Sequence, residues 1–477
     1  MSSAQEPHTS DTNLVADDGA GAPGGASSEG VEPDGAGLGR AGLHRIADTG
    51  AVAQLLPPYA ALKLLNRLDN DRARFSLCAL AVTAWSAWAY LRLRPPPGIA
   101  LANGHLRGYH TWAFAHLAYS DIPWLYQEHG FFTHGLPYIR VPVEYPVITG
   151  IFTWITAWFP GVQGYFMATA VAEWLLALGV LWLLYKLVPR HYYLFALSPL
   201  LLVYLMLNWD ILGIFLMLLA YKLYTDERWT ASGAVFSLGV FAKLFPIFYL
   251  PFIAAKLWRD RSIQPLKKMA ISFTVVSIVV NAPFMIFGFH NWQTFYSFNA
   301  TRGGKGLFIA AVDAVTLMIV LTALALLFRN VLRGGSVPRA AAFSFAVFLM
   351  VNKVFSPQYM LWLLVFALVA EWPAWTAWVL AGGGIADYLN AFTFLHFTWS
   401  PVLHKVPARL GPTGRWYQAE LYDLGITARY LAIAVSTIGA VVCARRGSAA
   451  PKQRSLVSPA KQRNSAHVKP PSPTPHH

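Results

Sequence analysis

The residues best suited to chemistry lie in one polar segment of an otherwise apolar chain. Residues 94–144 carry three carboxylates, Asp121, Glu128 and Glu144, among many aromatic side chains, and apolar segments flank this stretch on both sides. A chain that only had to sit in a bilayer would join its first spans by a short turn. A long first loop with acids and aromatics instead predicts a reaction centre at the membrane surface.

The composition indicates a membrane protein. Hydrophobic residues make up 56% of the chain and charged residues 13%, against roughly a quarter charged in an ordinary soluble domain. The net charge of +14 does not predict nucleic-acid binding, because Lys and Arg gather between apolar stretches and in the tail, as in cytoplasmic loops. Cys78 and Cys443 fall within apolar stretches, so no disulfide framework is expected.

The chain divides into three regions. Residues 1–74 are expected to be a disordered cytoplasmic region that ends in a short amphipathic lead-in. Residues 75–444 form the multispanning domain. Residues 445–477 carry seven Lys or Arg, six Pro and no acid, which predicts a disordered tail against the anionic cytoplasmic leaflet.

Apolar length and the placement of Lys and Arg predict an all-α polytopic protein of about twelve spans in the plasma membrane, with both termini cytoplasmic. The predicted spans are 75–93, 164–188, 191–207, 209–225, 230–242, 244–258, 268–289, 307–328, 339–353, 357–371, 373–396 and 426–444. The apolar residues 145–159 would break this parity if they crossed. They are therefore interpreted as a re-entrant or surface-lying helix.

Polar residues and proline interrupt two of the apolar regions. The segment 230–258 breaks at Lys243–Pro246, and the segment 339–371 breaks at Asn352–Pro357. Non-helical backbone at membrane depth is tolerated only where protein or a wet cavity surrounds it. The predicted topology brings both breaks and Asp210 to the same external side as the first loop, which predicts a polar pocket that opens outward beneath that loop.

Several short motifs resemble those of a known family. The chain has YSDIPWLY at 119–126, LPY at 136–138, EYP at 144–146, FAKLFPIFYLP at 241–251 and NKVFSPQYMLWLL at 352–364. In this order they resemble the multispanning GT-C glycosyltransferases, specifically the polyprenyl-phosphate-mannose-dependent group of actinobacteria, glycosyltransferase family 87. The resemblance covers roughly residues 75–444.

Two motifs depart from the family pattern. Tyr145-Pro146-Val147 stands where members often have Tyr-Pro-Pro, and Asn208-Trp209-Asp210 stands where they have Gly-Gln. These departures leave the fold expectation unchanged, but the donor sugar and the acceptor do not follow from the resemblance.

The resemblance implies a transfer, with inversion, of mannose or a related sugar from polyprenyl phosphate to a lipid-linked or glycan acceptor at the external face. A sugar hydroxyl is a poor nucleophile, so a carboxylate takes its proton as the bond forms. The leaving phosphate needs cations or hydrogen-bond donors. The expected partners are this donor, this acceptor and membrane lipids. No cofactor is expected, and no residue cluster has metal-ligand spacing.

Asp121 matches the first-loop acid of the family, and the resemblance implies that it is the catalytic base. The alternative is structural, because Ser120 or Asp121 before Pro123 is also good helix-capping chemistry. At the Tyr-Pro motif, Glu144 and Tyr145 are candidates for the substrate site. Glu144 either orients the acceptor or simply precedes a helix start.

Lys243 is the main candidate for the phosphate, because a lysine within an apolar stretch should face a cavity or a counter-charge. The alternatives are a salt bridge to Asp210 or snorkelling to the interface. Lys353, beside Asn352, has the same character. Asp210 is expected either to hold acceptor hydroxyls or to cap a helix that starts at Trp209.

The remaining candidates rest on weaker patterns. Arg302 and Lys305 lie in a glycine-rich segment that could close over phosphate, although it lacks the spacing of a nucleotide-binding loop. His290 is a candidate hydrogen-bond donor, with plain packing as the alternative. Gln358 and Tyr359 are candidates for the sugar site on the motif match alone.

A transporter or flippase is the alternative function, because broken helices and intramembrane charges also mark substrate pathways. The two breaks share similar Lys and Pro spacing, KLFP and KVFSP, as internal repeats would. The flanking segments do not otherwise repeat, and a transporter has no need of the long first loop. The sequence therefore favours the glycosyltransferase.

Overall fold

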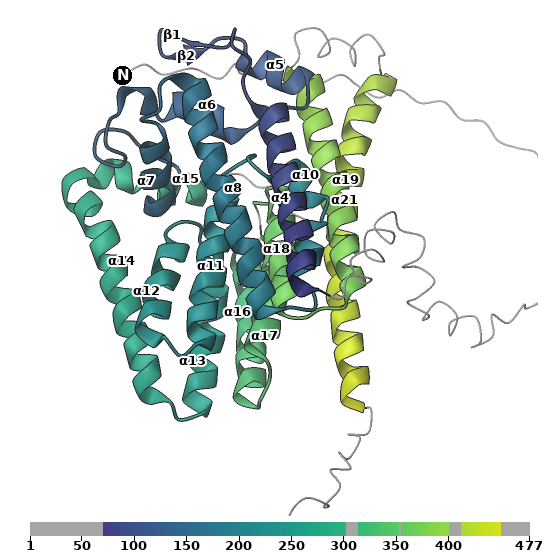
Figure 1. Cartoon of the computed structure of the whole chain (residues 1–477). Helices are drawn as coiled ribbons and strands as arrows, with labels where there is room; N and C mark the ends of the chain where they lie inside the picture. The colour runs from purple at the N-terminus through teal and green to yellow at the C-terminus, as the bar shows by residue number, and fades with distance from the viewer. Residues whose placement is uncertain (1–69, 302–312, 353, 400–411, 450–477) are drawn as a thin grey trace, which may run out of the picture. The chain divides into compact units, whose positions relative to one another are not determined.

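The computed structural model describes residues 70–301, 313–352, 354–399 and 412–449, which belong to one compact unit. These residues are predominantly helical, and most of the long helices run side by side (Figure 1). The principal helices are α4 (Asp71–Leu93), α8 (Gly161–Leu187), α11 (Asp210–Thr225), α12 (Trp229–Val240), α13 (Leu250–Arg259), α14 (Ile263–Trp292), α16 (Asp313–Leu332), α17 (Val337–Val351), α18 (Tyr359–Val369), α19 (Ala374–Trp399) and α21 (Pro412–Ala449). Most of the predicted disordered ends lie outside the described residues.

Four of these helices contain segments long and apolar enough to cross a membrane: Gly161–Leu187, Ile263–Trp292, Val315–Leu332 and Asp423–Arg445. On α14, many large apolar side chains such as Ile286 are exposed, and an extensive exposed apolar surface suits contact with lipid. The expectation of a predominantly helical membrane protein is confirmed to this extent. The twelve crossings and the GT-C type remain predictions.

The single span predicted over 191–207 is wrong. The structure has two helices of five residues there, α9 (Tyr192–Ala196) and α10 (Leu200–Tyr204), separated by Leu197, Ser198 and Pro199. Proline lacks the N–H that would continue the helix. The chain then leaves helical geometry again at Met206, which has a positive φ of 58°.

Both predicted breaks are present in the structure. Helix α12 ends at Val240, and a 3-10 helix, η2 (Phe245–Tyr249), leads into α13. Helix α17 ends at Val351, and α18 begins eight residues later at Tyr359. Local helix is thus lost where Lys243 and Asn352 interrupt the apolar sequence.

The apolar stretch 145–159 contains α7 (Val147–Thr156), a helix of ten residues. At 1.5 Å per residue it is about 15 Å long, about half of the bilayer core, and whether it crosses remains a prediction. Its start satisfies backbone groups at the first break. The Ile148 N–H donates to the Phe241 carbonyl (2.8 Å) and the Thr149 hydroxyl donates to the Ala242 carbonyl (2.7 Å).

The first loop folds into several small elements at one end of the helices (Figure 1). They are a two-stranded antiparallel pair, β1 (Leu101–Ala102) and β2 (His105–Leu106), the helices α5 (Tyr109–Ala115) and α6 (Asp121–Glu128), and a 3-10 turn, η1 (Phe131–Thr133). Helix α15 (Thr294–Thr301) lies at the same end. Helix α6, which begins at Asp121 and ends at Glu128, thus lies at this end of the long helices.

Candidate functional site

The start of α6 is fixed to the irregular segment that precedes α11. The Ser120 hydroxyl caps α6 by accepting from the Ile122 N–H (3.2 Å) and donates to the Met206 carbonyl (2.6 Å). The Asp121 N–H donates to the Leu207 carbonyl (2.9 Å). Because Ser120 supplies the cap, the Asp121 carboxylate is available for other contacts.

The Asp121 carboxylate accepts two hydrogen bonds. The Tyr119 hydroxyl donates to one oxygen (2.9 Å), and the Asn208 side-chain amide donates to the other (2.7 Å). Burial raises the pKa of Asp121, and these two hydrogen bonds together with the Lys243 charge oppose that rise. The residue as a whole is half-buried. It therefore presents an oriented carboxylate with a raised pKa at the base of the first loop.

Asn208 connects Asp121 to Lys243. Its oxygen accepts from the Lys243 ammonium (2.7 Å) and from the Trp209 N–H (2.7 Å). These two donors fix the orientation of the amide, so its NH₂ group must face acceptors. It donates to Asp121 and to the Tyr145 hydroxyl (2.6 Å).

Lys243 is held by three partners at the α12 break. Besides the Asn208 oxygen, its ammonium lies 3.1 Å from an Asp210 oxygen and 4.5 Å from the centre of the Tyr145 ring. Both side chains of the ion pair are buried. The salt bridge considered as an alternative for Lys243 is therefore present. Asp210 lies in the first turn of α11, and no side-chain capping hydrogen bond forms there.

Close backbone packing keeps Lys243 in place. A Cβ added at Gly213 on α11 would lie 2.8 Å from the Lys243 Cβ, so the broken segment approaches α11 more closely than any side chain would allow. After the break, the Phe245 ring packs against the Trp362 ring of α18, with centroids 4.3 Å apart. The two breaks are thus joined by aromatic contact.

The structure brings four predicted site residues together: Asp121, Tyr145, Asp210 and Lys243. We call these four and Asn208 the Asn208 network. Glu144 is half-buried directly before Tyr145.

Other predicted residues have local contacts. His290 is exposed on α14. The Asn352 amide donates to the Val354 carbonyl (2.5 Å), and Gln358 accepts from the Ser356 hydroxyl (2.5 Å). Tyr359 packs on Trp362. The predicted residues Arg302, Lys305 and Lys353 lie outside the described residues.

Three further residues of this region are not among the predicted site residues: Tyr119, Glu173 and Asn208. Tyr119 and Asn208 are neutral, so nothing in their charge marks them. Glu173 carried a usable signal, because it is the one acid within the apolar helix α8, and ionisable residues in such helices are usually functional. Its carboxylate is fully buried, and neither oxygen has a hydrogen-bond partner among the described residues. It lies within electrostatic range of Asp210 and Lys243.

Within the described part of the chain, no three His, Cys, Asp or Glu side chains form a group that could hold a metal ion. The arrangement instead offers an oriented carboxylate, two phenol groups and one buried ammonium. Comparison of the sequence with protein-family models and with curated proteins gave no match.

Proposed function

We propose that this protein is a membrane glycosyltransferase of the GT-C type. It would transfer mannose, or a related sugar, with inversion from a polyprenyl-phosphate donor to a hydroxyl of a lipid-linked or glycan acceptor. The observation that carries the proposal is the Asp121 carboxylate, which belongs to a half-buried residue of the first loop and is oriented by Tyr119 and Asn208. The Asn208 network lies where the first-loop elements meet the helical unit. This position suits a donor whose phosphate reaches the polar centre while its apolar tail stays in lipid.

In the proposed reaction Asp121 is the general base. It accepts the proton of the acceptor hydroxyl as the new bond forms between that oxygen and the anomeric carbon. The bond from the anomeric carbon to the phosphate oxygen breaks, and polyprenyl phosphate leaves with the electron pair. Because the configuration inverts, the phosphate must leave on the face opposite Asp121.

Lys243 contributes positive charge to this centre. Its ammonium already contacts Asn208, Asp210 and the Tyr145 ring, so we assign it to holding the Asn208 network and stabilising negative charge nearby. Arg302 and Lys305, the other candidates for the phosphate from the sequence, lie outside the described residues.

The distribution of charge supports an orientation with the first loop outside and both termini in the cytoplasm. Segments with Lys and Arg connect α13 to α14 and α16 to α17. These connections lie together, because Arg259 donates to the Val331 carbonyl (2.9 Å), and they lie away from the first loop (Figure 1). An excess of basic residues is typical of cytoplasmic loops.

The test is sugar transfer from labelled polyprenyl-phosphate mannose in membranes that contain equal amounts of each variant. Asp121→Asn should lose at least 100-fold in rate, since general-base catalysis contributes about 10²–10⁴-fold, and should still bind donor. Glu128→Gln is the matched control. Glu128 ends the same helix, is exposed and accepts from Gln127, so this variant should keep the wild-type rate.

Equal transfer by wild type and Asp121→Asn would remove Asp121 from the mechanism. If wild type transferred neither mannose nor arabinose nor glucose from polyprenyl phosphate, the glycosyltransferase proposal would fail. Transport of a lipid-linked substrate would then be the function to test.

A further inference from the structure

Arg92 lies in the last turn of α4 and is half-buried. An arginine at the end of an apolar helix ordinarily extends its charged group to the membrane surface. Here Nη1 donates to the Leu117 carbonyl (2.9 Å) and to the Tyr388 hydroxyl, and Nη2 donates to the Val203 carbonyl (3.3 Å). The guanidinium therefore binds three groups of the protein itself.

The two carbonyls belong to the two segments that meet in the Asn208 network. Leu117 lies between α5 and α6, and Val203 lies on α10, shortly before Asn208. Helix α10 contacts both α4 and α19 (Figure 1). Arg92 thus connects the segment that carries Asp121 to the segment that carries Asn208.

The Leu117 turn depends on its surroundings. Leu117 ends α5 in the left-handed conformation, with a φ of 51°, and the Ala118 N–H donates to the Ala113 carbonyl (2.7 Å). Such a helix ending ordinarily has glycine at this position, and another residue keeps the conformation only where neighbouring contacts hold it. The Leu117 carbonyl accepts from both Arg92 and the Tyr388 hydroxyl (3.1 Å). These two donors therefore stabilise the turn.

Tyr119 follows this turn and transmits its position to Asp121. The Tyr119 ring stacks on Phe114 of α5, with centroids 5.1 Å apart and planes at 7°. Its hydroxyl donates to the Asp121 carboxylate (2.9 Å). Because Leu117 is two residues before Tyr119, a shift of the turn would move this hydroxyl away from the carboxylate.

We infer that Arg92 is a positioning residue for the Asp121 carboxylate. By holding one carbonyl in each segment, it fixes the two hydrogen-bond donors of that carboxylate, Tyr119 and Asn208. The role requires arginine, because its planar fork reaches several acceptors at once, whereas a lysine ammonium is a single point charge. The effect on catalysis rests on the proposed sugar transfer, but the effect on the protonation of Asp121 does not.

The test compares Arg92→Gln and Arg92→Lys with the wild type in sugar transfer from labelled polyprenyl-phosphate mannose. Both variants should lose between about 10-fold and 100-fold in kcat, since a displacement of about 1 Å can cost about 10²-fold. The KM for the donor should change little, because Arg92 acts on the base and not on donor binding.

A pH profile distinguishes positioning from a general loss of stability. Burial raises the pKa of Asp121, its two hydrogen bonds and the Lys243 charge oppose that rise, and the Asp210 charge adds to it. Of these groups, Arg92 fixes only the two hydrogen-bond donors. Their displacement should therefore move the acidic limb of the rate profile to higher pH. A purely structural role would lower the whole profile without moving its limb.

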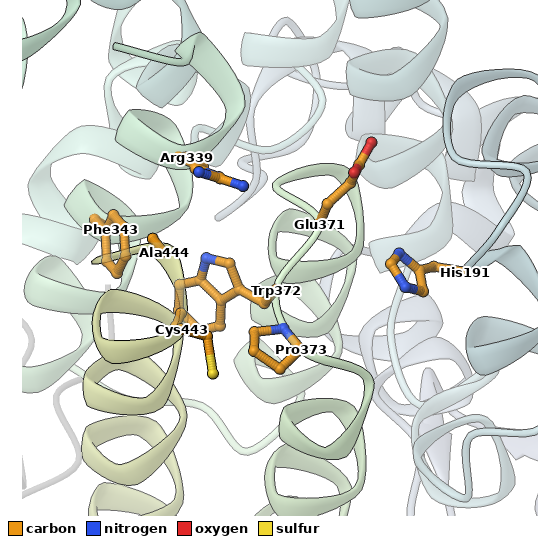
Figure 2. Close-up of a pocket in the computed structure, with 9 residues that line it drawn as sticks. His191, Arg339, Phe343, Glu371, Trp372, Pro373, Cys443 and Ala444 are labelled. Carbon is orange, nitrogen blue, oxygen red and sulfur yellow. The ribbon is translucent and has the colours of Figure 1, made fainter. Parts of the chain in front are cut away.

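Arg339→Gln is the matched control. Arg339 also donates to a backbone carbonyl, that of Ala370 (3.5 Å), but it lines a cavity together with Glu371 and Trp372 (Figure 2). The residues that line this cavity do not include any member of the Asn208 network. This variant should keep both the rate and the limb of the wild type.

A second measurement does not use sugar transfer. The infrared C=O band of protonated Asp121, identified by its absence from Asp121→Asn, should appear at a higher pH in Arg92→Gln than in the wild type. Tyr388→Phe keeps the ring and removes one donor to the Leu117 carbonyl, so it should move the band in the same direction by less.

Maleimide labelling reports whether each variant is folded. Cys78 is buried on α4 and Cys443 is exposed, so only Cys443 should react in every variant. If Cys78 became reactive in Arg92→Gln, the milder Tyr388→Phe would decide the outcome.

An unmoved band in a folded Arg92→Gln and in Tyr388→Phe would overturn the inference, and so would a wild-type profile in Arg92→Lys. If the wild type transferred no sugar but the band moved in Arg92→Gln, the proposed function would fail and the positioning of Asp121 by Arg92 would stand.

Discussion

The ion pair between Lys243 and Asp210 should behave as one energetic unit. The two charged atoms lie 3.1 Å apart, and the side chains are 7% and 1% exposed. Removing one partner of such a buried pair costs roughly 3–5 kcal/mol, because the other charge is left uncompensated. The hydrogen bond that Lys243→Met removes from Asn208 should cost little more, because the Asn208 oxygen still accepts from the Trp209 N–H.

A double-mutant cycle measures this coupling. Lys243→Met and Asp210→Asn should each lower the free energy of unfolding by about 3–5 kcal/mol. The double variant buries no unpaired charge from this pair. Its free energy of unfolding should therefore fall by less than the sum of the two single effects, with a coupling energy of at least about 2 kcal/mol. The assay is titration of the purified protein in mild detergent with dodecyl sulfate, followed by tryptophan fluorescence.

The matched control is the ion pair between Lys256 and Asp260, at i and i+4 on the surface. Its atoms lie closer, at 2.8 Å, but its side chains are 41% and 34% exposed. Exposed pairs of this kind contribute little to stability because solvent screens them, so the coupling there should be much weaker than in the buried pair. If the Lys243 and Asp210 effects were as additive as those of this surface pair, the argument that burial makes the buried pair a unit would be refuted.

Three further outcomes are expected. Gly213→Ala forces a Cβ to 2.8 Å from the Lys243 Cβ, so the free energy of unfolding should fall by about 1–3 kcal/mol; an unchanged value would show that the break can move. Tyr119→Phe removes a hydrogen bond that lowers the pKa of Asp121, so the acidic limb of the rate profile should move to higher pH, and a move to lower pH would contradict the assignment. Burial lowers the pKa of His129 to about 4. Its neutral form is therefore favoured in the folded protein, so its contribution to the free energy of unfolding should be at its full value above about pH 6.5 and should fall as the pH drops toward 4. His129→Phe should remove that decline in thermal melts at pH 7 and pH 5, and a decline equal to wild type would exclude His129 as its source.

The parts of the fold that sequence could predict are those set by single residues with strong local effects. Lysine with proline at 243–246 and asparagine with proline at 352–357 cannot continue an apolar helix, and both sites are breaks. The same reasoning failed for 191–207, where apolar content alone suggested a span. The apolar content concealed the effect of Ser198 and Pro199, which lie where the helix is interrupted.

The site was predictable to the extent that charge marks it. Asp210 and Lys243 stand out because ionised groups within apolar sequence need partners, and their pairing was one stated alternative. Asn208 is harder to find this way, because a neutral amide also needs hydrogen-bond partners when it is buried but carries no charge that marks it. Its role arises from the Met206 and Leu207 carbonyls, which hold the start of α6 next to it, and long-range backbone contacts of this kind have no local sequence pattern.

The salt bridge and a role in chemistry are compatible explanations of Lys243. An unpaired ammonium this close would hold the pKa of Asp121 low, and a carboxylate with a low pKa is a poor general base. Asp210 offsets that ammonium, and its own charge raises the pKa of Asp121. Asp121 and Asp210 both interact with this one ammonium, so a proton arriving on Asp121 removes its repulsion by Asp210. Under the proposed mechanism, the pair that stabilises the network thereby also favours the proton transfer.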